Sequence, residues 1–333
     1  MRIAITGASG NVGTALLRWL CGAEHDIVAI SRRRPPRQPP YDRAEWHPID
    51  IGEPAARTEM EHAFAGADAV IHLAWLIQPT REREVMQRVN QAGTAAVRDA
   101  AIAAGVPHFV HQSSVGAYSP GHGKWVDESW PTDGVPTSTY SVDKAAAERL
   151  MDEAERRMVV TRVRPALIFQ DDAASEIVRY FLGPLVPHAL IRRGVLRLAP
   201  LPEELAFQVV HADDVAAALE LVVRRRAGGA FNVAAGPLIN RTAWREVFGG
   251  VGPALPASVL RQAAAASWRA RLQQTEPGWV DLAVAAPYLR TKRLEDLGWT
   301  ARHDARDVLG SFIDAMGRGA GRPGPVLYPG AKH

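Results

Sequence analysis

Three glycines near the N-terminus, Gly7, Gly10 and Gly13, separate a short apolar run from an amphipathic segment. This pattern is typical of a β-strand that turns tightly into an α-helix, because glycine permits both the sharp turn and close packing of the helix on the strand. The unpaired N–H groups and the dipole at the start of such a helix attract an anion. The stretch therefore predicts a site for a dinucleotide pyrophosphate, although a plain strand-to-helix loop has the same pattern.

Further along the chain, apolar runs alternate with helical patterns. We expect strands at residues 25–31, 45–51, 67–74, 108–114 and 159–165, and helices at 55–65, 85–104 and 140–157. Continuous apolar strands that alternate with helices indicate a parallel sheet covered by helices on both faces. The predicted fold class is therefore α/β, a doubly wound parallel sheet of the Rossmann type.

The end of the second expected strand bears on the choice of cofactor. In dinucleotide-binding folds an acidic residue at this place binds the adenosine ribose, whereas an arginine accommodates a 2′-phosphate. Here Ser31 is followed by Arg32, Arg33 and Arg34, with no acid. We therefore expect NADP in preference to NAD; solvent-exposed arginines with no ligand are the alternative.

Composition limits the other partners. The net charge of +3 over 333 residues is small and the arginine clusters are short, so we expect no nucleic-acid binding. No apolar run reaches membrane-spanning length, so we expect no association with a membrane.

The lone Cys21 excludes an intramolecular disulfide and the chain enters a strand directly, which together predict a cytoplasmic protein. His108 and His111, three apart on a strand, point to opposite faces, and we predict no metal.

A segment rich in Gly, Pro and Ser, residues 118–138, is too long for a plain connection and indicates a functional loop. Directly after it, Tyr140 and Lys144 lie four residues apart at the start of a helix, which places both side chains on one face. A nearby ammonium group lowers the pKa of a phenol, so such a pair suits proton transfer at a carbonyl or an alcohol. An exposed tyrosine beside an exposed lysine has the same spacing.

Eight short motifs then match one family in order. They are Thr6 to Gly13, Asp50-Ile51, His72 to Ala74, Asn90 to Thr94, Ser113-Ser114 with Tyr118, Tyr140 to Lys144, Arg164-Pro165, and His211 to Val215. With these motifs over about two thirds of its length, the chain resembles the extended short-chain dehydrogenase/reductase family, the NAD(P)-dependent epimerase/dehydratase group.

The resemblance implies a role for each motif. The glycine turn would hold the pyrophosphate, Asp50 and Ile51 the adenine, and Ala74 would pass beside the cofactor ribose. The full set expected to bind the cofactor is Gly7, Ser9, Gly10, Asn11, Val12, Gly13, Arg32, Arg33, Asp50, Ile51, Leu73, Ala74, Asn90, Tyr140 and Lys144.

The resemblance also implies a catalytic group. Tyr140 would be the general acid/base, Lys144 would bind the nicotinamide ribose and lower the pKa of Tyr140, and Ser114 would hydrogen-bond the reacting oxygen. Ser113 competes for the last role, and the spacing of Ser114 to Tyr118 favours Ser114.

Departures from the family pattern bear on the substrate. Val115 and Gly116 stand where sugar dehydratases tend to carry an Asp-Glu pair, and Leu167 stands where epimerases often have an asparagine that anchors the diphosphate. Trp75 replaces a small residue, and we expect it to narrow the pocket, with core packing as the alternative. The expected apolar lip of the substrate site is Trp75, Leu76, Leu167, Phe181 and Leu182.

We expect a dinucleotide-binding domain at 1–165, rejoined by about 209–235, and a substrate-binding lobe from 166–208 and 236–320. Residues 321–333 are expected to be a loop or a partly disordered tail. Asp213 or Asp214 is expected to cap the helix that begins at Val215 and to support it through salt links.

The leading functional hypothesis is an NADP-preferring carbonyl reductase or alcohol dehydrogenase for a small-molecule substrate. A sugar epimerase that uses tightly held NAD and the same Tyr140 is the alternative, and a catalytically silent NADP-binding regulator is a third. A homodimer through the helices at 93–104 and after Tyr140 is also expected, because small residues allow close helix approach.

Overall fold

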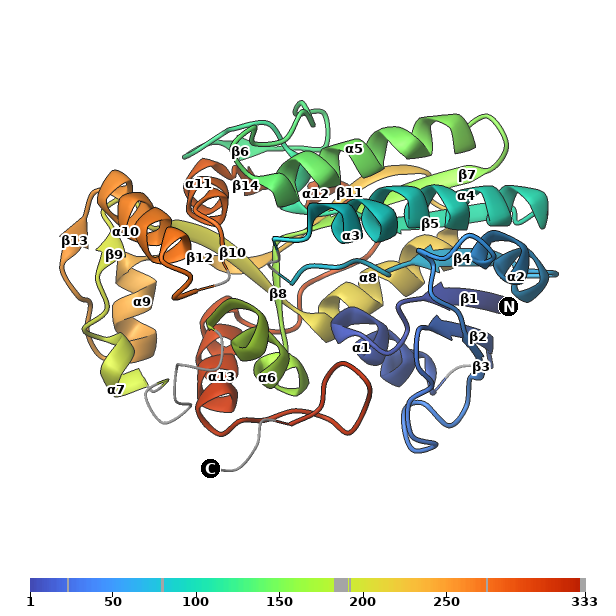
Figure 1. Cartoon of the computed structure of the whole chain (residues 1–333), viewed down its shortest axis with the longest axis horizontal. Helices are drawn as coiled ribbons and strands as arrows, with labels where there is room; N and C mark the ends of the chain where they lie inside the picture. The colour runs from blue at the N-terminus through green and yellow to red at the C-terminus, as the bar shows by residue number, and fades with distance from the viewer. Residues whose placement is uncertain (23, 79–80, 183–190, 192, 274, 330–333) are drawn as a thin grey trace.

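The computed structural model describes residues 1–22, 24–78, 81–182, 191, 193–273 and 275–329. A sheet of seven parallel strands forms its larger part, in the order β11-β7-β5-β4-β1-β2-β3 (Figure 1). The strands are β1 (Arg2–Thr6), β2 (Asp26–Ser31), β3 (Glu45–Pro48), β4 (Ala69–His72), β5 (His108–Gln112), β7 (Val159–Pro165) and β11 (Gly229–Val233). The predicted Rossmann-type α/β sheet is confirmed.

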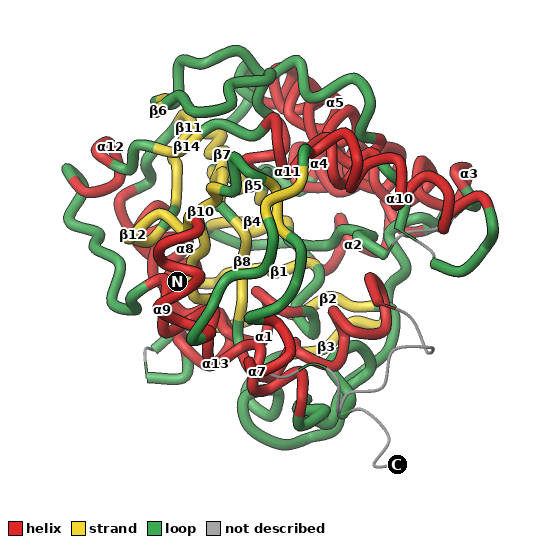
Figure 2. The backbone as a smooth tube through the Cα atoms, turned by 90° about the vertical axis from the view of Figure 1, so that its left-hand side faces the viewer, coloured by secondary structure: helices red, strands yellow, loops and turns green. Residues whose placement is uncertain are grey.

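Helices cover both faces of this sheet, and Figure 2 shows the strands between them. Helices α1 (Asn11–Leu20) and α8 (Ala212–Arg225) pack together on one face; α2 (Ala56–Ala63), α4 (Thr94–Ala103) and α5 (Thr139–Ala154) cover the other. Because side chains alternate along a strand, Ile3 and Ile5 of β1 enter the first core while Ala4 enters the second.

The helix expected at 85–104 is present, with an irregular middle. It consists of α3 (Arg83–Gln87), a π-helical turn at Arg88–Gly93, and α4. Such π-helical turns inside α-helices often accompany functional sites. Here the turn contains Asn90 and leads directly into Thr94, two residues that hold the loop and the strand beside the cavity described below.

The smaller lobe is built on a second sheet of β12 (Ala235–Asn240), β10 (Ala206–His211) and β8 (Leu167–Phe169), at the left of Figure 1. Two short pairs join β9 (Leu201–Pro202) to β13 (Ala254–Leu255) and β6 (Trp125–Val126) to β14 (Tyr288–Leu289). The remaining helices are α6 (Ala174–Ile177), α7 (Arg193–Leu196), α9 (Arg241–Phe248), α10 (Ala257–Arg269), α11 (Gly278–Ala285), α12 (Lys292–Glu295) and α13 (Ala305–Gly317).

The sequence predicts that residues from about 209 to 235 rejoin the dinucleotide-binding domain. Within this range β10 differs from α8 and β11, because β10 pairs with β8 and β12 in the smaller sheet, whereas α8 and β11 join the large sheet. The apolar pair in β10 explains the difference, because Val210 enters the core of the large sheet and Val209 enters the core of the lobe. A strand buried on both faces has the same sequence pattern in either sheet.

Two segments expected to be irregular are held by specific contacts. In the loop at 118–138, β6 pairs with β14, and Trp130 donates from its indole to the carbonyl of Ser119. The C-terminal segment 321–329 is a loop as predicted, fixed by Arg33, Arg179 and Arg322, whereas residues 330–333 lie outside the described part. None of the helices in the described residues has both the length and the apolar character to cross a bilayer.

Candidate active site

A cavity of about 790 Å³ lies at the carboxyl ends of the parallel strands. Its wall includes Gly7 after β1, Arg32 after β2, Ala74 after β4, Ser114 after β5 and Pro165 at the end of β7. Open α/β sheets bind their ligands at this edge, because the turns and helix N-termini gather there. With the exception of Asn90, every residue that the sequence predicts to bind the cofactor lies in this wall, as do Trp75, Ser114 and Leu167 of the predicted substrate site.

The glycine turn fits closely against its neighbours. Gly7 has a φ of +72°, and a Cβ atom there would lie 2.6 Å from the backbone nitrogen of Ala74. A Cβ atom on Gly13 would lie 2.4 Å from the carbonyl oxygen of Gly7, so helix α1 packs directly on the turn. Helix α1 begins after Gly10, with no side-chain cap and no acid in its first turn. The backbone N–H groups at its N-terminus therefore have no capping side chain and can bind an anion in the cavity. The pyrophosphate of a dinucleotide is such an anion.

Asn11 and Asn90 act on the protein framework. The side-chain amide of Asn11 donates to the carbonyl of Ile168, 3.3 Å away, and accepts from Gln170, so it joins α1 to the segment around β8. Asn90 is fully buried and uses its amide on the backbone N–H and carbonyl of Leu76, at 2.8 and 2.9 Å. Its polar atoms hold the loop after β4, and the assignment of Asn90 to the cofactor stays a prediction.

The histidine of the motif after β4 is also structural. His72 is buried, and its two ring nitrogens bond the hydroxyls of Thr6 and Thr94, at 2.7 and 2.9 Å. One side chain thus joins β1, β4 and the long helix beneath the cavity floor. Within this motif His72 therefore supports the framework, while Leu73 and Ala74 line the cavity.

The arginines after β2 have different surroundings. Arg33 donates to the carbonyl of Pro325, 2.9 Å away, and Arg34 donates to the carbonyl of Trp46. Arg32 is exposed, lines the cavity and makes no hydrogen bond to the other described residues. Asp50 and Ile51 line the same cavity as Arg32, and the Asp50 carboxylate accepts from the backbone N–H of Gly52.

The expected catalytic side chains line the same cavity as the glycine turn. Lys144 is buried, donates to the carbonyl of Gln112, 3.1 Å away, and places its Nζ 3.6 Å from the centre of the Trp75 ring. Burial lowers the pKa of Lys144 to about 7, while the carboxylate of Glu148 acts in the opposite direction. A buried amine near half-protonation at neutral pH can give up or accept a proton readily.

The pKa of Tyr140 differs from the expectation. Burial raises the pKa of Tyr140 to about 12, and a hydrogen bond with Ser114 acts in the opposite direction. The sequence predicts a pKa lowered by Lys144, but desolvation of the phenolate is the stronger effect in this cavity. The phenol therefore carries its proton at neutral pH, as a general acid must.

Of the two candidate serines, Ser114 is the one whose hydroxyl acts to lower the pKa of Tyr140. The Ser114 hydroxyl also accepts from the backbone N–H of Gly116, 3.0 Å away. The hydroxyl of Ser113 is buried and finds no partner among the described residues. A Cβ atom on Gly116 would lie 2.9 Å from the Tyr140 ring, so an acid cannot replace Gly116 without moving that ring.

Aromatic rings from distant segments surround Tyr140. Trp75 meets it edge-on with ring centres 6.4 Å apart, and Trp279 covers it at 4.8 Å. Phe181 packs against Trp279 at 4.9 Å, and Leu167 lines the cavity with an exposed side chain; the side chain of Leu182 lies outside the described residues. Sequence reasoning missed Trp279, whose one signal is its place after Pro277-Gly278 at the start of an apolar stretch.

The loop at 118–138 does not contribute to the cavity wall. Its residue Tyr118 is buried and donates its hydroxyl proton to the side chain of Asn232, 2.7 Å away. Arg164 bonds the Tyr118 hydroxyl and the carbonyl of Glu128, and pairs with Glu148. These residues form a buried polar network behind the catalytic helix, so the loop supports the site from outside.

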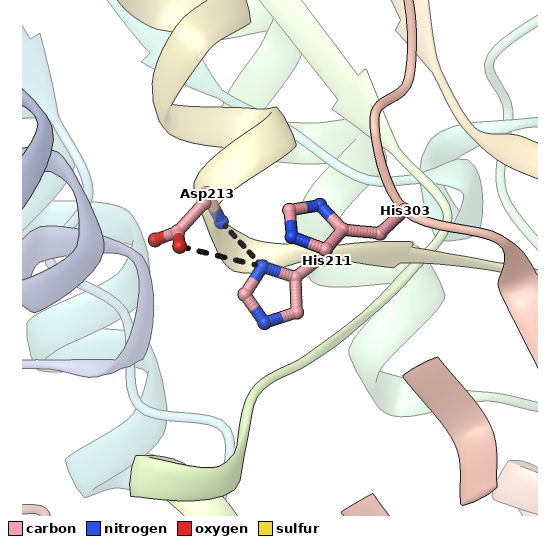
Figure 3. Close-up of side chains that lie close together, drawn as sticks. All are labelled: His211, Asp213 and His303. Atoms are coloured by element: carbon pink, nitrogen blue, oxygen red, sulfur yellow. Dashed lines mark hydrogen bonds and ion pairs between the residues drawn. The ribbon is translucent and has the colours of Figure 1, made fainter. Parts of the chain in front are cut away.

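One group of side chains has ligand types suited to a metal. His211, Asp213 and His303 offer atoms that lie within 4.8 Å of one another (Figure 3). The two imidazole rings are stacked, with centres 4.1 Å apart, so their in-plane lone pairs do not converge on one point. Asp213 is paired with Arg18, and His303 bonds Asp214. The group joins the loop before α13 to the start of α8, and the absence of a metal stays a prediction.

The cap of α8 also differs from the expected one. His211 is the N-cap, and its Nδ1 accepts from the backbone N–H of Asp213, 3.1 Å away. Asp213 and Asp214 lie in the first helical turn, so the prediction that one of them caps the helix is wrong. Their carboxylates form the expected salt links instead, with Arg18 and His303.

Comparison with known proteins places the chain. The sequence model of the NAD dependent epimerase/dehydratase family matches residues 3–234. An uncharacterized protein of Mycobacterium tuberculosis is 31% identical over 224 residues, 67% of this chain and 20% of that protein, so this chain spans about a fifth of that relative's length. The 2′-dehydrokanamycin reductase of Streptomyces kanamyceticus is 31% identical over 305 residues, 90% of this chain and 77% of that enzyme.

Among solved structures, the UDP-glucose 4-epimerase of Thermus thermophilus in complex with NAD has a TM-score of 0.69. Its sequence identity is 19%, with 96% of this chain and all of that chain covered, so the likeness shows the fold. The family match covers more than half of the chain and includes the glycine turn and the Tyr140–Lys144 pair. The chain belongs to the NAD dependent epimerase/dehydratase family, a family of NAD(P)-dependent enzymes.

Proposed function

We propose that this protein is an NADP-preferring carbonyl reductase that works with Tyr140 as its general acid. The observation that carries the proposal is that Ser114, Tyr140 and Lys144 line the same cavity as the glycine turn. A nicotinamide cofactor held by that turn supplies a hydride to the substrate carbon. The protein binds and orients the two reactants, and it supplies the proton.

The proton comes from the Tyr140 hydroxyl. With a pKa of about 12 the phenol is protonated at neutral pH, and it can donate to the carbonyl oxygen as negative charge develops there. The Ser114 hydroxyl lines the cavity with Tyr140 and shares the stabilisation of that oxygen. Lys144 lies on the same helix face, and its positive charge favours the phenolate that remains until solvent returns the proton.

The wall of the cavity favours reduction over dehydration. Gly116 leaves no room for the second acid that a dehydratase uses at this place, because the Tyr140 ring occupies it. The aromatic rings around Tyr140 suit a substrate with an apolar body. The likeness to 2′-dehydrokanamycin reductase, which covers 90% of this chain, supports the same class of reaction.

Replacement of Tyr140 by phenylalanine tests the proposal. We expect Tyr140→Phe to lower kcat for NADPH-dependent ketone reduction by about 100-fold or more, since a positioned acid contributes about 10²–10⁴-fold. The measurement is NADPH oxidation against a panel of ketones. Tyr328→Phe is the matched control, because Tyr328 is an exposed tyrosine outside the cavity wall.

The same assay separates the alternatives. A reductase consumes NADPH in proportion to product, whereas an epimerase converts a sugar nucleotide with no net change in cofactor. A silent regulator binds NADPH and turns over neither class of substrate. A fall in kcat of less than about fivefold in Tyr140→Phe rejects Tyr140 as the acid.

Three further assignments stay predictions. The preference for NADP rests on Arg32 in the cavity wall, and its test is given in the Discussion. The homodimer would form through α4 and α5, whose small residues allow close approach. The cytoplasmic location rests on the lone Cys21.

A further inference from the structure

Trp279 reaches the catalytic tyrosine from the opposite half of the chain. Its ring centre lies 4.8 Å from that of Tyr140 with an interplanar angle of 33°, so the rings overlap face to face with a tilt. Phe181 meets Trp279 edge-on at 4.9 Å. Trp75 stands edge-on to Tyr140 on another side. Two tryptophans from distant segments thus lie against Tyr140, and Phe181 lies against Trp279.

Contacts between the start of α11 and the start of α5 hold Trp279 in this position. A Cβ atom on Gly278 would lie 2.4 Å from the carbonyl oxygen of Thr137, so the two backbones touch just before the catalytic helix. The carboxylate of Glu276 accepts from the backbone N–H of Thr139, 3.2 Å away, and from its hydroxyl. These contacts tie α11 to the first turn of α5, the turn that carries Tyr140.

The charges in the wall differ between the two ends of the cavity. Among the described residues that line it, the cations are Arg32 and Arg33 after β2, and Lys144 beneath Trp75. The wall contributed by the smaller lobe is mostly apolar and includes Leu167, Phe207, Leu260 and Leu282, while its two charged side chains, Glu176 and Glu204, are acids. Cationic side chains commonly bind a diphosphate, and the described residues of this part of the wall supply none.

We infer that Trp279 determines substrate specificity by stacking on the flat apolar face of an uncharged carbonyl compound beside Tyr140. The inference rests on the proposed function and names its substrate class. Aromatic stacking and burial of apolar area favour such a substrate. The diphosphate of a nucleotide sugar would meet apolar side chains and the carboxylate of Glu204 in the same place.

The test compares two ketones that differ in their rings. 2-Acetonaphthone has a flat apolar ring system and 2-butanone has none, and both are assayed with NADPH. In Trp279→Ala we expect KM for 2-acetonaphthone to rise roughly tenfold. For 2-butanone, which has no ring to stack, we expect a much smaller rise in KM, so that the ratio of kcat/KM for the two ketones falls roughly tenfold in favour of 2-butanone. Trp279→Phe should restore KM for the larger ketone.

Trp268→Ala is the matched control, since Trp268 is a half-buried tryptophan that does not line the cavity. Equilibrium binding of 2-acetonaphthone and of UDP-glucose, measured with NADP⁺ present, gives a second readout. We expect the ketone to bind more tightly than UDP-glucose, and Trp279→Ala to weaken the ketone alone.

Each result has a defined meaning. Equal losses for both ketones in Trp279→Ala, or tighter binding of UDP-glucose, overturn the inference and leave the proposed reductase standing. If neither ketone is reduced but 2-acetonaphthone binds through Trp279, the proposed reaction fails and the assigned ligand class survives. If 2-acetonaphthone is neither bound nor reduced, the inference is overturned, and the proposed reductase is overturned with it only if 2-butanone and the ketone panel are not reduced either.

Discussion

At the scale of single residues, the buried ion pair Arg164–Glu148 lies behind the active site and must offset its own desolvation. The guanidinium donates to both carboxylate oxygens, at 2.8 and 2.6 Å, and both side chains are buried. Two further donors reach the hydroxyl of Tyr118 and the carbonyl of Glu128, each at 3.0 Å. The guanidinium thus makes four hydrogen bonds, which help a buried ion pair to offset its desolvation.

Removal of one partner should be costly. We expect Glu148→Leu to lower the free energy of unfolding by about 3–5 kcal/mol, because it leaves a buried guanidinium with no counter-charge. Urea unfolding followed by circular dichroism measures the change.

Two further variants show whether the buried charge is the cause. The double variant Glu148→Leu with Arg164→Met should recover most of the loss, since neither charge then remains buried. Glu53→Gln breaks the exposed pair with Arg88 and should cost less than about 1 kcal/mol. A single Glu148→Leu variant as stable as Glu53→Gln contradicts this account.

The sequence predicts the residues of the site unevenly. Tyr140, Lys144 and the glycines could be found because their chemistry depends on spacing along one helix or one turn. The bonds of Asn90 to the backbone of Leu76 could not be predicted, because a motif does not say which groups an amide faces. Trp279 could not be found either, because its contact with Tyr140 depends on the docking of α11 on α5.

At the scale of elements, the C-terminal segment changes the interpretation of the loop after β2. Arg33 donates to the carbonyl of Pro325, and Arg179 donates to the carbonyls of Val326 and Tyr328. Pro325 and Val326 line the cavity together with Arg32. The segment thus closes the end of the cavity where the adenosine ribose is expected and engages Arg33, which makes Arg32 the stronger candidate for the 2′-phosphate.

Replacement of Arg32 by aspartate tests this assignment. We expect Arg32→Asp to raise the Kd of NADPH by about 10- to 100-fold, since hydrogen bonds to charged groups are worth about 1.5–3 kcal/mol. The Kd of NADH should change less than about threefold, because it has no 2′-phosphate. Titration of cofactor fluorescence measures both. Arg37→Asp introduces the same charge change at an exposed residue outside the wall, and equal weakening of both cofactors by Arg32→Asp would sink the assignment.

Elements of the large sheet could be predicted because their strands are apolar and alternate with helices. β10 is buried on both faces and has the same apolar pattern as the strands of the large sheet, so its place in the smaller sheet could not be predicted. Its pairing with β12 depends on residues 235–240, which follow the return to the large sheet. The partner of a strand is a property of the assembled chain, which hydrophobic periodicity does not contain.

At the scale of the whole molecule, the central strands bury three histidines in uncharged form. Burial, with a smaller contribution from Lys144, lowers the pKa of His72 to about 3. Burial and the charge of Arg226 lower the pKa of His108 to about 4. Burial is also the main cause that lowers the pKa of His111 well below its ordinary value. Because each would be desolvated as a cation, the folded protein excludes protons that the unfolded chain accepts.

The stability of the molecule should therefore fall as the pH is lowered from about 6.5, the ordinary pKa of histidine, toward 4. In this window the unfolded chain binds up to three more protons at these sites than the folded protein, and each contributes up to about 1.4 kcal/mol per pH unit. Urea unfolding at pH 5, 5.5 and 6 measures the slope of the free energy of unfolding against pH.

His108→Gln should reduce this slope by the contribution of about one proton, because glutamine stays neutral and can still donate to the Thr161 hydroxyl that His108 bonds. His62→Gln, on the exposed side of α2, is the control for the replacement of a histidine outside the sheet. An unchanged slope in His108→Gln would mean that His108 is protonated in the folded protein.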